Sequence, residues 1–278
     1  ARDWMQRYVT VGATVVLDGT PAPDPTPVPT PPPSVRGRTI AVYMMDGVGK
    51  VSQIPPECNQ VRVAFLQGRG LVEWGGDSPA KTAADLTAWR SAGPGREVLV
   101  SIGGQDGNVD FSALEQSVRA IEKTFPLDGI DWDVEANELD VATCVGISRR
   151  LAAGREATWI TSFVPSGGPP VAQYLKAAVQ CQQAGLRVQF GSQLYDTEVS
   201  LSGAIGVLTQ EIAALGPESV LVGMMIRNDA KHWTNAQCKA NMKAIADKWP
   251  SIGGAYLWES ASAGTAQWAA DMDQVIPR

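Results

Sequence analysis

Segments that read as β-strands alternate with segments that read as helices along most of this chain of 278 residues. Eight short apolar runs, most of them rich in β-branched residues, are candidate strands. They are Thr39–Met44, Gln60–Phe65, Glu97–Ile102, Gly129–Val134, Thr158–Phe163, Arg187–Gln193, Ser219–Ile226 and Gly253–Leu257. Helix-like stretches between them include Thr82–Ser91, Ser112–Lys123, Leu139–Ala152, Val171–Ala184, Ala236–Lys248 and Ala266–Val275. Eight strands separated by crossovers predict an α/β fold, a (β/α)₈ TIM barrel, for which about 250 residues is typical.

A proline-rich run precedes this region. Residues 21–33 read PAPDPTPVPTPPP, a composition that favours extended, stiff polyproline II. Before it, Tyr8–Leu17 has strand character, but twenty residues are too few to bury a core of their own. We therefore expect a short strand-like segment in residues 1–20, a linker in residues 21–38 and one large domain in residues 39–278. The first segment would be an anchor on that domain or on another chain, or the remnant of a neighbouring module.

Composition excludes several classes of function. The chain has 23 basic and 29 acidic residues, a formal charge of −6, and no cluster of Lys or Arg, which argues against nucleic acid or an anionic membrane surface as partner. No apolar run approaches the ~20 residues that a membrane span needs. The single histidine, His232, and the absence of any C-x-x-C pair argue against a metal site, and no phosphate-binding glycine pattern implies a nucleotide cofactor. Whether the four scattered cysteines form disulfides or remain buried thiols is left open; they are Cys58, Cys144, Cys181 and Cys238.

Three acidic residues, Asp131, Asp133 and Glu135, occupy every second position of the run Asp128–Glu135. The residues between them are apolar and β-prone, so the run predicts a strand with three carboxylates on one face. Like charges held this close raise one another's pKa and destabilise a fold. A solvated edge strand could carry such a row, but Trp132 on the opposite face argues against solvent there. The pattern therefore indicates a catalytic site.

The same run resembles the D-G-x-D-x-D-x-E signature of the family-18 glycoside hydrolases, the chitinase family. Three further segments resemble landmarks of that family, in the same order. Val98–Gly104 resembles its S-x-G-G strand, Gln193–Asp196 its M-x-Y-D/N strand end with glutamine for the commoner methionine, and Gly254–Glu259 its tryptophan-bearing segment near the chain end. The resemblance covers the chain from about Thr39 onward and implies a TIM barrel independently of the strand count.

The resemblance also implies roles for the acidic residues. Glu135 would be the general acid and base, with its pKa raised by the neighbouring Asp133 carboxylate. Asp133 would orient the acetamido N–H of the substrate, and Asp131 would lie behind it, sharing a proton and a hydrogen bond. The acetamido oxygen itself would attack the anomeric carbon with net retention, helped by the Tyr195 hydroxyl, so that no second carboxylate nucleophile is required. Asp128 is more easily explained as a structural residue at the start of the strand.

Six residues are candidates for substrate binding: Trp258, Gln193, Asp196, Tyr43, Ser101 and Trp74. Trp258 would form the apolar floor beneath the −1 sugar. By strand period alone, however, Trp258 and Tyr195 could be core aromatics, and Tyr43 could simply fill the barrel. Ser101 would more often support the inner carboxylates by hydrogen bonding. Trp74, like Trp233 in another loop, could be a packing anchor instead of a stacking platform.

The expected function is hydrolysis of β-1,4-linked N-acetylglucosamine polymers by a chitinase-like endo-hydrolase, without a cofactor. Alternatives are an endo-β-N-acetylglucosaminidase on N-glycans, a peptidoglycan glucosaminidase, or a non-catalytic chitinase-like carbohydrate-binding domain on a larger assembly such as a phage particle. The presence of all three carboxylates favours the enzyme. The short stretch Arg227–Trp233 after the seventh strand predicts an open groove without an inserted domain. We expect the protein to be extracellular, or displayed on a surface or particle through its proline-rich linker.

Overall fold

The computed structural model describes residues 38–45, 49–67, 70–71, 78–105, 107–135, 139–166, 170–196, 200–227 and 232–276. The predictions for residues 1–20 and for nearly all of the linker, as well as Trp74, lie outside the described residues.

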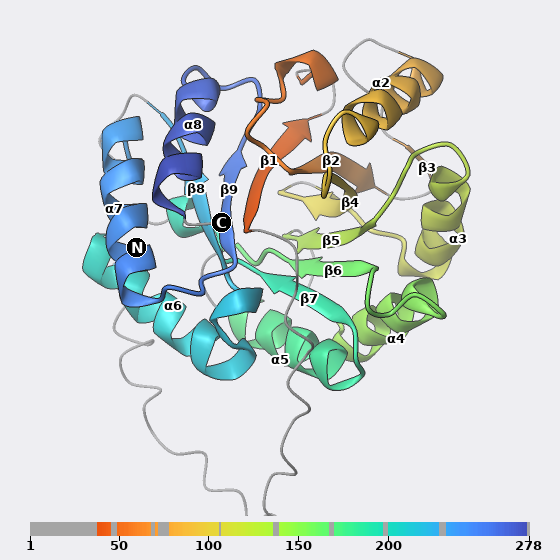
Figure 1. Cartoon of the computed structure of the whole chain (residues 1–278). Coiled ribbons are helices and arrows are strands. Elements are labelled where there is room, and N and C mark those ends of the chain that lie inside the picture. Colours follow the sequence, from red (N-terminus) through yellow and green to blue (C-terminus); the bar gives the residue numbers. More distant parts are fainter. Residues whose placement is uncertain are drawn as a thin grey trace, which may run out of the picture. The chain divides into compact units, whose positions relative to one another are not determined.

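Eight parallel strands form the centre of the fold (Figure 1). They are β1 (Thr39–Met45), β2 (Gln60–Gln67), β4 (Glu97–Gly104), β5 (Gly129–Val134), β6 (Ile160–Phe163), β7 (Arg187–Phe190), β8 (Leu221–Met225) and β9 (Gly254–Trp258). Their order is β7-β6-β5-β4-β2-β1-β9-β8, and a parallel bridge between Phe190 and Val220 links the two edges. The short β3 (Gly70–Leu71) pairs antiparallel with β2. This nearly closed ring confirms the predicted TIM barrel.

Helices lie outside the ring of strands (Figure 1). They are α2 (Pro79–Ser91), α3 (Phe111–Glu122), α4 (Val141–Ala152), α5 (Pro170–Gln183), α6 (Leu201–Leu215), α7 (Asn235–Lys248) and α8 (Thr265–Val275). Short 3₁₀ helices are η1 (Val51–Gln53), η2 (Leu194–Asp196) and η3 (Pro217–Ser219). Ser78, Ser200 and Thr234 each begin a helix by accepting a backbone N–H. Helix α6 is not among the stretches named from sequence, since Gly203 and Gly206 lower its intrinsic helix propensity.

The apolar face of β5 packs under helices, as its alternating pattern predicts. Trp132 has no exposed surface. Its indole N–H donates to the Ser148 hydroxyl of α4 at 3.0 Å, and its ring stacks on Phe111 of α3 with centroids 6.4 Å apart. The opposite face of β5 is therefore left to point into the barrel, and this is the face that carries the carboxylates.

The sixth predicted strand is shorter than expected. Strand β7 ends at Phe190, and the backbone continues irregularly to η2, which contains Tyr195. Gln193 N–H still donates to the carbonyl of Pro165 at 3.0 Å. Pro165 has no N–H to return, so the regular ladder cannot extend.

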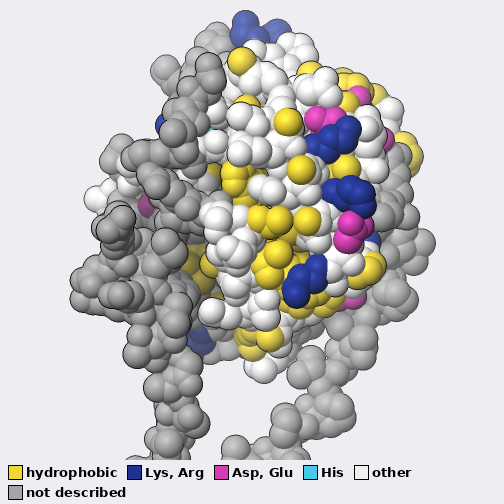
Figure 2. Space-filling model, turned by 90° about the vertical axis from the view of Figure 1, so that its left-hand side faces the viewer, with side chains coloured by type: hydrophobic (Ala, Val, Ile, Leu, Met, Phe, Trp, Pro, Cys, Tyr) yellow, Lys and Arg dark blue, Asp and Glu magenta, His cyan; other side chains and the backbone are white. Residues whose placement is uncertain are grey.

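Cys58, Cys144, Cys181 and Cys238 are buried free thiols. On the described part of the face in Figure 2, basic and acidic side chains lie close to one another. Within the described ranges, no helix is long and apolar enough to cross a membrane.

Candidate active site

Strand β5 places the acidic row at the mouth of the barrel. Asp131 and Asp133 are 0% and 2% exposed, whereas Glu135, just beyond the strand, is half-buried. In the register with β4, Ser101 lies beside Asp131 and Gly103 beside Asp133. The carboxylates therefore step from the closed interior of the barrel toward its C-terminal rim, where barrel enzymes place their chemistry.

Asp131, the deepest carboxylate, is surrounded by donors. The hydroxyls of Tyr43 and Ser101 donate to its Oδ2 at 2.7 and 2.8 Å, and Nη1 of Arg62 donates to its Oδ1 at 3.2 Å. None of the four side chains has exposed surface. The structure thus places Tyr43 and Ser101, two candidate substrate-binding residues, beneath the carboxylates.

Asp133 and Glu135 are bridged by Gln193, whose Nε2 donates to Asp133 Oδ1 at 2.8 Å and to Glu135 Oε1 at 3.3 Å. Burial, and then the charges of Glu135 and Asp131, raise the pKa of Asp133 well above its usual range. Burial of Asp133 beside two other carboxylates therefore favours its protonated form.

Two glycines allow β4 to approach these residues closely. Gly103 and Gly104 have φ values of 111° and 83°, which disfavour any residue with a side chain. A Cβ on Gly103 would lie 2.4 Å from the carbonyl oxygen of Asp133, and one on Gly104 would lie 2.7 Å from the ring of Phe65. The S-x-G-G segment is therefore needed for the geometry of the site.

Half-buried aromatic side chains lie at the mouth of the barrel. Phe65, Tyr195 and Trp258 pack against a buried cluster that includes Tyr43 and Tyr256. Trp258 stacks on Phe65 with centroids 5.5 Å and planes 25° apart, and its centroid lies 5.0 Å from that of Tyr43. The Tyr256 ring lies deeper, has no exposed surface, and donates its hydroxyl to the carbonyl of Gly191 at 3.0 Å. The peptide bonds Ala64–Phe65, within β2, and Trp258–Glu259, at the end of β9, are cis.

Several residues of the site were not found from sequence. Arg62 and Phe65 belong to a strand that was recognised, and an arginine in the middle of such a strand is a signal that could have been followed. Tyr174 on α5 accepts the N–H of Val134 at 2.6 Å and donates to its carbonyl at 2.9 Å. It thereby holds the backbone between Asp133 and Glu135, a role that no local pattern reveals.

The sequence also singled out Asp128, Asp196 and Trp233. Asp128 is at the opposite end of β5, where it pairs with Arg90 at 2.5 Å and accepts the N–H of Val98 at 3.0 Å. This contact fits the structural role expected for it. Asp196 lies in η2, but its side chain is outside the described set. Trp233 is half-buried in the loop before α7. Among the residues described, no group of His, Cys, Asp and Glu is arranged to hold a metal ion.

Comparison with solved structures identifies the fold. A protein named as a chitinase A from Streptomyces coelicolor matches with a TM-score of 0.71 and 19% identity, over 86% of this chain and 98% of that one. A GH18 chitinase from Pseudoalteromonas aurantia matches with 0.68 and 18%, over 85% and 99%. A xylanase and α-amylase inhibitor protein from Scadoxus multiflorus matches with 0.68 and 17%, over 85% and 98%. No protein-family model and no curated protein matches the sequence.

The fold is therefore that of the GH18 chitinases. At these identities the likeness concerns the fold alone. The inhibitor protein among the matches has the same fold but a different activity. Any assignment of chemistry must come from the residues of this chain.

Proposed function

We propose that this chain is a retaining, substrate-assisted glycoside hydrolase that cleaves β-1,4-linked N-acetylglucosamine polymers internally. The observation that carries the proposal is the row Asp131, Asp133 and Glu135, which extends through a nearly closed barrel to a rim of half-buried aromatic rings. An acid at the edge of solvent, a buried acid beside it and an apolar platform are what cleavage of a glycosidic bond requires.

Glu135 is the proton donor in this mechanism. It protonates the glycosidic oxygen as the acetamido oxygen of the −1 sugar attacks the anomeric carbon, so that the bond to the leaving sugar breaks and a cyclic oxazolinium forms. Water, deprotonated by Glu135, then opens this ring with overall retention. Asp133 receives the acetamido N–H, and Tyr195 donates to the acetamido oxygen. Trp258 supports the apolar face of the −1 sugar.

A carbohydrate-binding domain without catalysis is the second candidate. Its support is the inhibitor protein among the structural matches, which shows that this fold serves other roles. Three features favour the enzyme in this chain: the acid Glu135 is present, the row behind it is complete, and the aromatic rim is half-buried. Display on a surface or particle through the proline-rich linker is compatible with either activity.

The loop after β8 bears on the substrate. Only residues 226–234 separate β8 from α7, too few for an inserted domain. We infer an open groove that accepts the interior of a polymer, as an endo-acting enzyme requires.

Parallel incubation with chitin oligomers, a high-mannose N-glycopeptide and purified peptidoglycan tests the proposal. We expect cleavage of the chitin oligomers and no cleavage of fully deacetylated oligomers. NMR should show that the β-anomer of the product is released first. Equal cleavage of deacetylated oligomers would exclude substrate assistance. Binding of oligomers without any cleavage would favour the non-catalytic alternative.

A further inference from the structure

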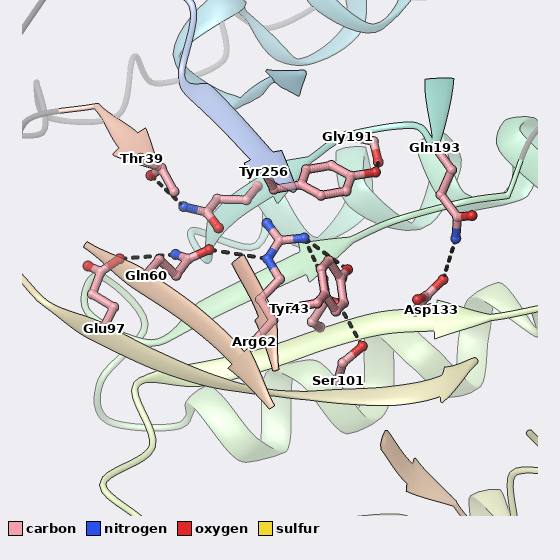
Figure 3. Close-up of polar contacts among 12 residues, drawn as sticks. Thr39, Tyr43, Gln60, Arg62, Glu97, Ser101, Asp133, Gly191, Gln193 and Tyr256 are labelled. Carbon is pink, nitrogen blue, oxygen red and sulfur yellow. Dashed lines mark hydrogen bonds and ion pairs between the residues drawn. The ribbon is translucent and has the colours of Figure 1, made fainter. Parts of the chain in front are cut away.

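Arg62 of β2 lies inside the barrel, directly beneath the acidic row. Its Nη1 donates to Asp131 Oδ1 and to the Tyr43 hydroxyl, each at 3.2 Å, and both ionic partners are completely buried. The guanidinium also lies 5.4 Å from the ring centroid of Tyr43 and 4.9 Å from that of Tyr256 (Figure 3). Because a guanidinium does not lose its proton in proteins, this places a full positive charge in the interior of the barrel.

The far side of Arg62 is held by a chain of polar contacts that leads to the other end of the barrel (Figure 3). Its Nε donates to Gln60 Oε1 at 3.2 Å, and Gln60 Nε2 donates to Glu97 Oε2 at 3.1 Å. Glu97 is fixed in turn by Arg187, with 2.6 Å between Nη1 and Oε1. The guanidinium is therefore held from both sides and cannot leave Asp131 without breaking buried hydrogen bonds.

The contacts around Asp131 are satisfied when it is an anion. A carboxylate only accepts hydrogen bonds, and Arg62, Tyr43 and Ser101 all supply donors. A buried arginine without an ionised partner would be strongly destabilising. The geometry thus couples the two charges.

We propose that Arg62 is a positioning residue that fixes Asp131 as a permanent anion below Asp133. This proposal rests on the proposed hydrolase function. It has a specific consequence: the proton of the acidic row is confined to Asp133 and Glu135, the pair bridged by Gln193, instead of being shared between Asp131 and Asp133.

The electrostatics of the row agree with this arrangement. After burial, the charges of Glu135 and Asp131 raise the pKa of Asp133, and the charge of Arg62 lowers it by less than Asp131 raises it. Of the two charges in the ion pair, that of Asp131 therefore has the larger effect on the pKa of Asp133. Among the described residues, the titratable and charged groups around the row include Tyr43 on β1, Arg62 on β2, Tyr256 on β9, Tyr174 on α5, Tyr195 in η2, and Asp131, Asp133 and Glu135 on or after β5.

The pH dependence of kcat/KM on a soluble N-acetylglucosamine oligomer tests the proposal. In the Arg62→Met and Asp131→Asn double variant both charges disappear. The basic limb of the pH profile, where the acidic row loses its proton, should then move to lower pH. If Asp131 were neutral in the wild type, the double variant would lose only a positive charge. The limb would then move to higher pH, and such a movement, or an unchanged limb, would overturn the proposal.

The single variants and a matched control sharpen this test. In Arg62→Met alone the unpaired Asp131 should take up a proton, so the basic limb should again move to lower pH. We expect kcat to fall by up to about 100-fold, as small misplacements of catalytic groups can cause, with a smaller change in KM. Arg62→Lys, which keeps the charge, should move the limb less. Arg90→Met removes another arginine paired with an aspartate of the same segment, Asp128, and should leave the limb in place.

A second measurement does not depend on activity or on the single variant folding. Carboxyl ¹³C NMR of the whole chain labelled at aspartate should show an ionised Asp131 from pH 5 to pH 8, with the Asp131 signal assigned by its absence from the Arg62→Met and Asp131→Asn double variant. A signal that titrates in this range would overturn the ion pair even in an active enzyme. A wild type that cleaves no oligomer while Asp131 stays ionised would overturn the proposed function instead, and with it the positioning role.

Discussion

Gln193 donates its side-chain amide to Asp133, with 2.8 Å between Nε2 and Oδ1. The same nitrogen lies 3.3 Å from Glu135 Oε1, so one neutral donor bridges the two carboxylates nearest the barrel mouth. The segment around it resembles a family motif in which methionine is commoner, and methionine could not donate this bond. The contact is therefore a place where this chain's chemistry departs from the pattern it resembles.

Gln193→Met should lower kcat/KM by roughly 10-fold or more, because hydrogen bonds to charged groups contribute about 1.5–3 kcal/mol. Gln189→Met is the matched control. Gln189 is also buried in the barrel, but it donates to the Thr39 hydroxyl at 3.1 Å, away from the carboxylates. Steady-state kinetics on one oligomer should separate the two variants. Similar losses in both would indicate a general packing effect.

Glu135→Gln should abolish hydrolysis while preserving the fold and the binding of sugar. The substitution keeps the side chain's volume but removes the proton donor, a loss of about 10²–10⁴-fold in rate. Asp128→Asn is the control within the same motif, since Asp128 pairs with Arg90 at the opposite end of β5. It should lower stability and spare activity. Near-normal turnover by the Glu135 variant would remove Glu135 from its assigned role.

Trp258→Ala should lower kcat and not merely raise KM, because a platform that favours the distorted sugar acts in the transition state. Trp258 is half-buried, whereas Trp268 on α8 has no exposed surface. Trp268→Ala should therefore cost the ~3–5 kcal/mol typical of a buried aromatic, and Trp258→Ala less. Urea unfolding and kinetics on both variants check this. An inverted order of stability, or unchanged kinetics for Trp258→Ala, would contradict it.

The barrel and the acidic row could be predicted from sequence because their signals are local. Acids at alternate positions of a strand indicate which face is polar and which is apolar, and eight strands with crossovers permit few folds. The surroundings of the row are not local: Arg62 and Asp131 lie 69 positions apart, and Tyr43 and Asp131 lie 88 apart. Tyr43, Ser101 and Gln193 could be singled out, but whether each contacts a carboxylate or the sugar depends on how strands meet across the barrel.

Glu211 on α6 makes the stability of the fold depend on pH. It is 1% exposed and accepts a hydrogen bond from Ser192, and burial raises its pKa to about 8. The unfolded chain loses this proton at its ordinary pKa, so the stability that the group contributes is full below that value. It is lost progressively as the pH rises from the ordinary pKa of a glutamate to the folded-state pKa of about 8, by roughly 1.4 kcal/mol per pH unit between the two. Glu211→Gln should lack this loss in urea unfolding between pH 4 and pH 9. Parallel curves for the two proteins would contradict the prediction.

A chain that begins at Ser34 should fold and retain activity on soluble oligomers, because all eight barrel strands lie between Thr39 and Trp258. Circular dichroism and kinetics against the full chain provide the measurement. Loss of both fold and activity would show instead that Tyr8–Leu17 completes the barrel.

The reactivity of the four buried thiols reports local opening of the fold. Cys58 precedes β2, and Cys144, Cys181 and Cys238 lie on α4, α5 and α7, so they sample separate sectors of the ring. Burial raises the pKa of Cys181 and Cys238 to about 12 and that of the other two further, so alkylation must wait until each sector exposes its sulfur. The rate at each cysteine then measures how often that sector opens, without any introduced probe.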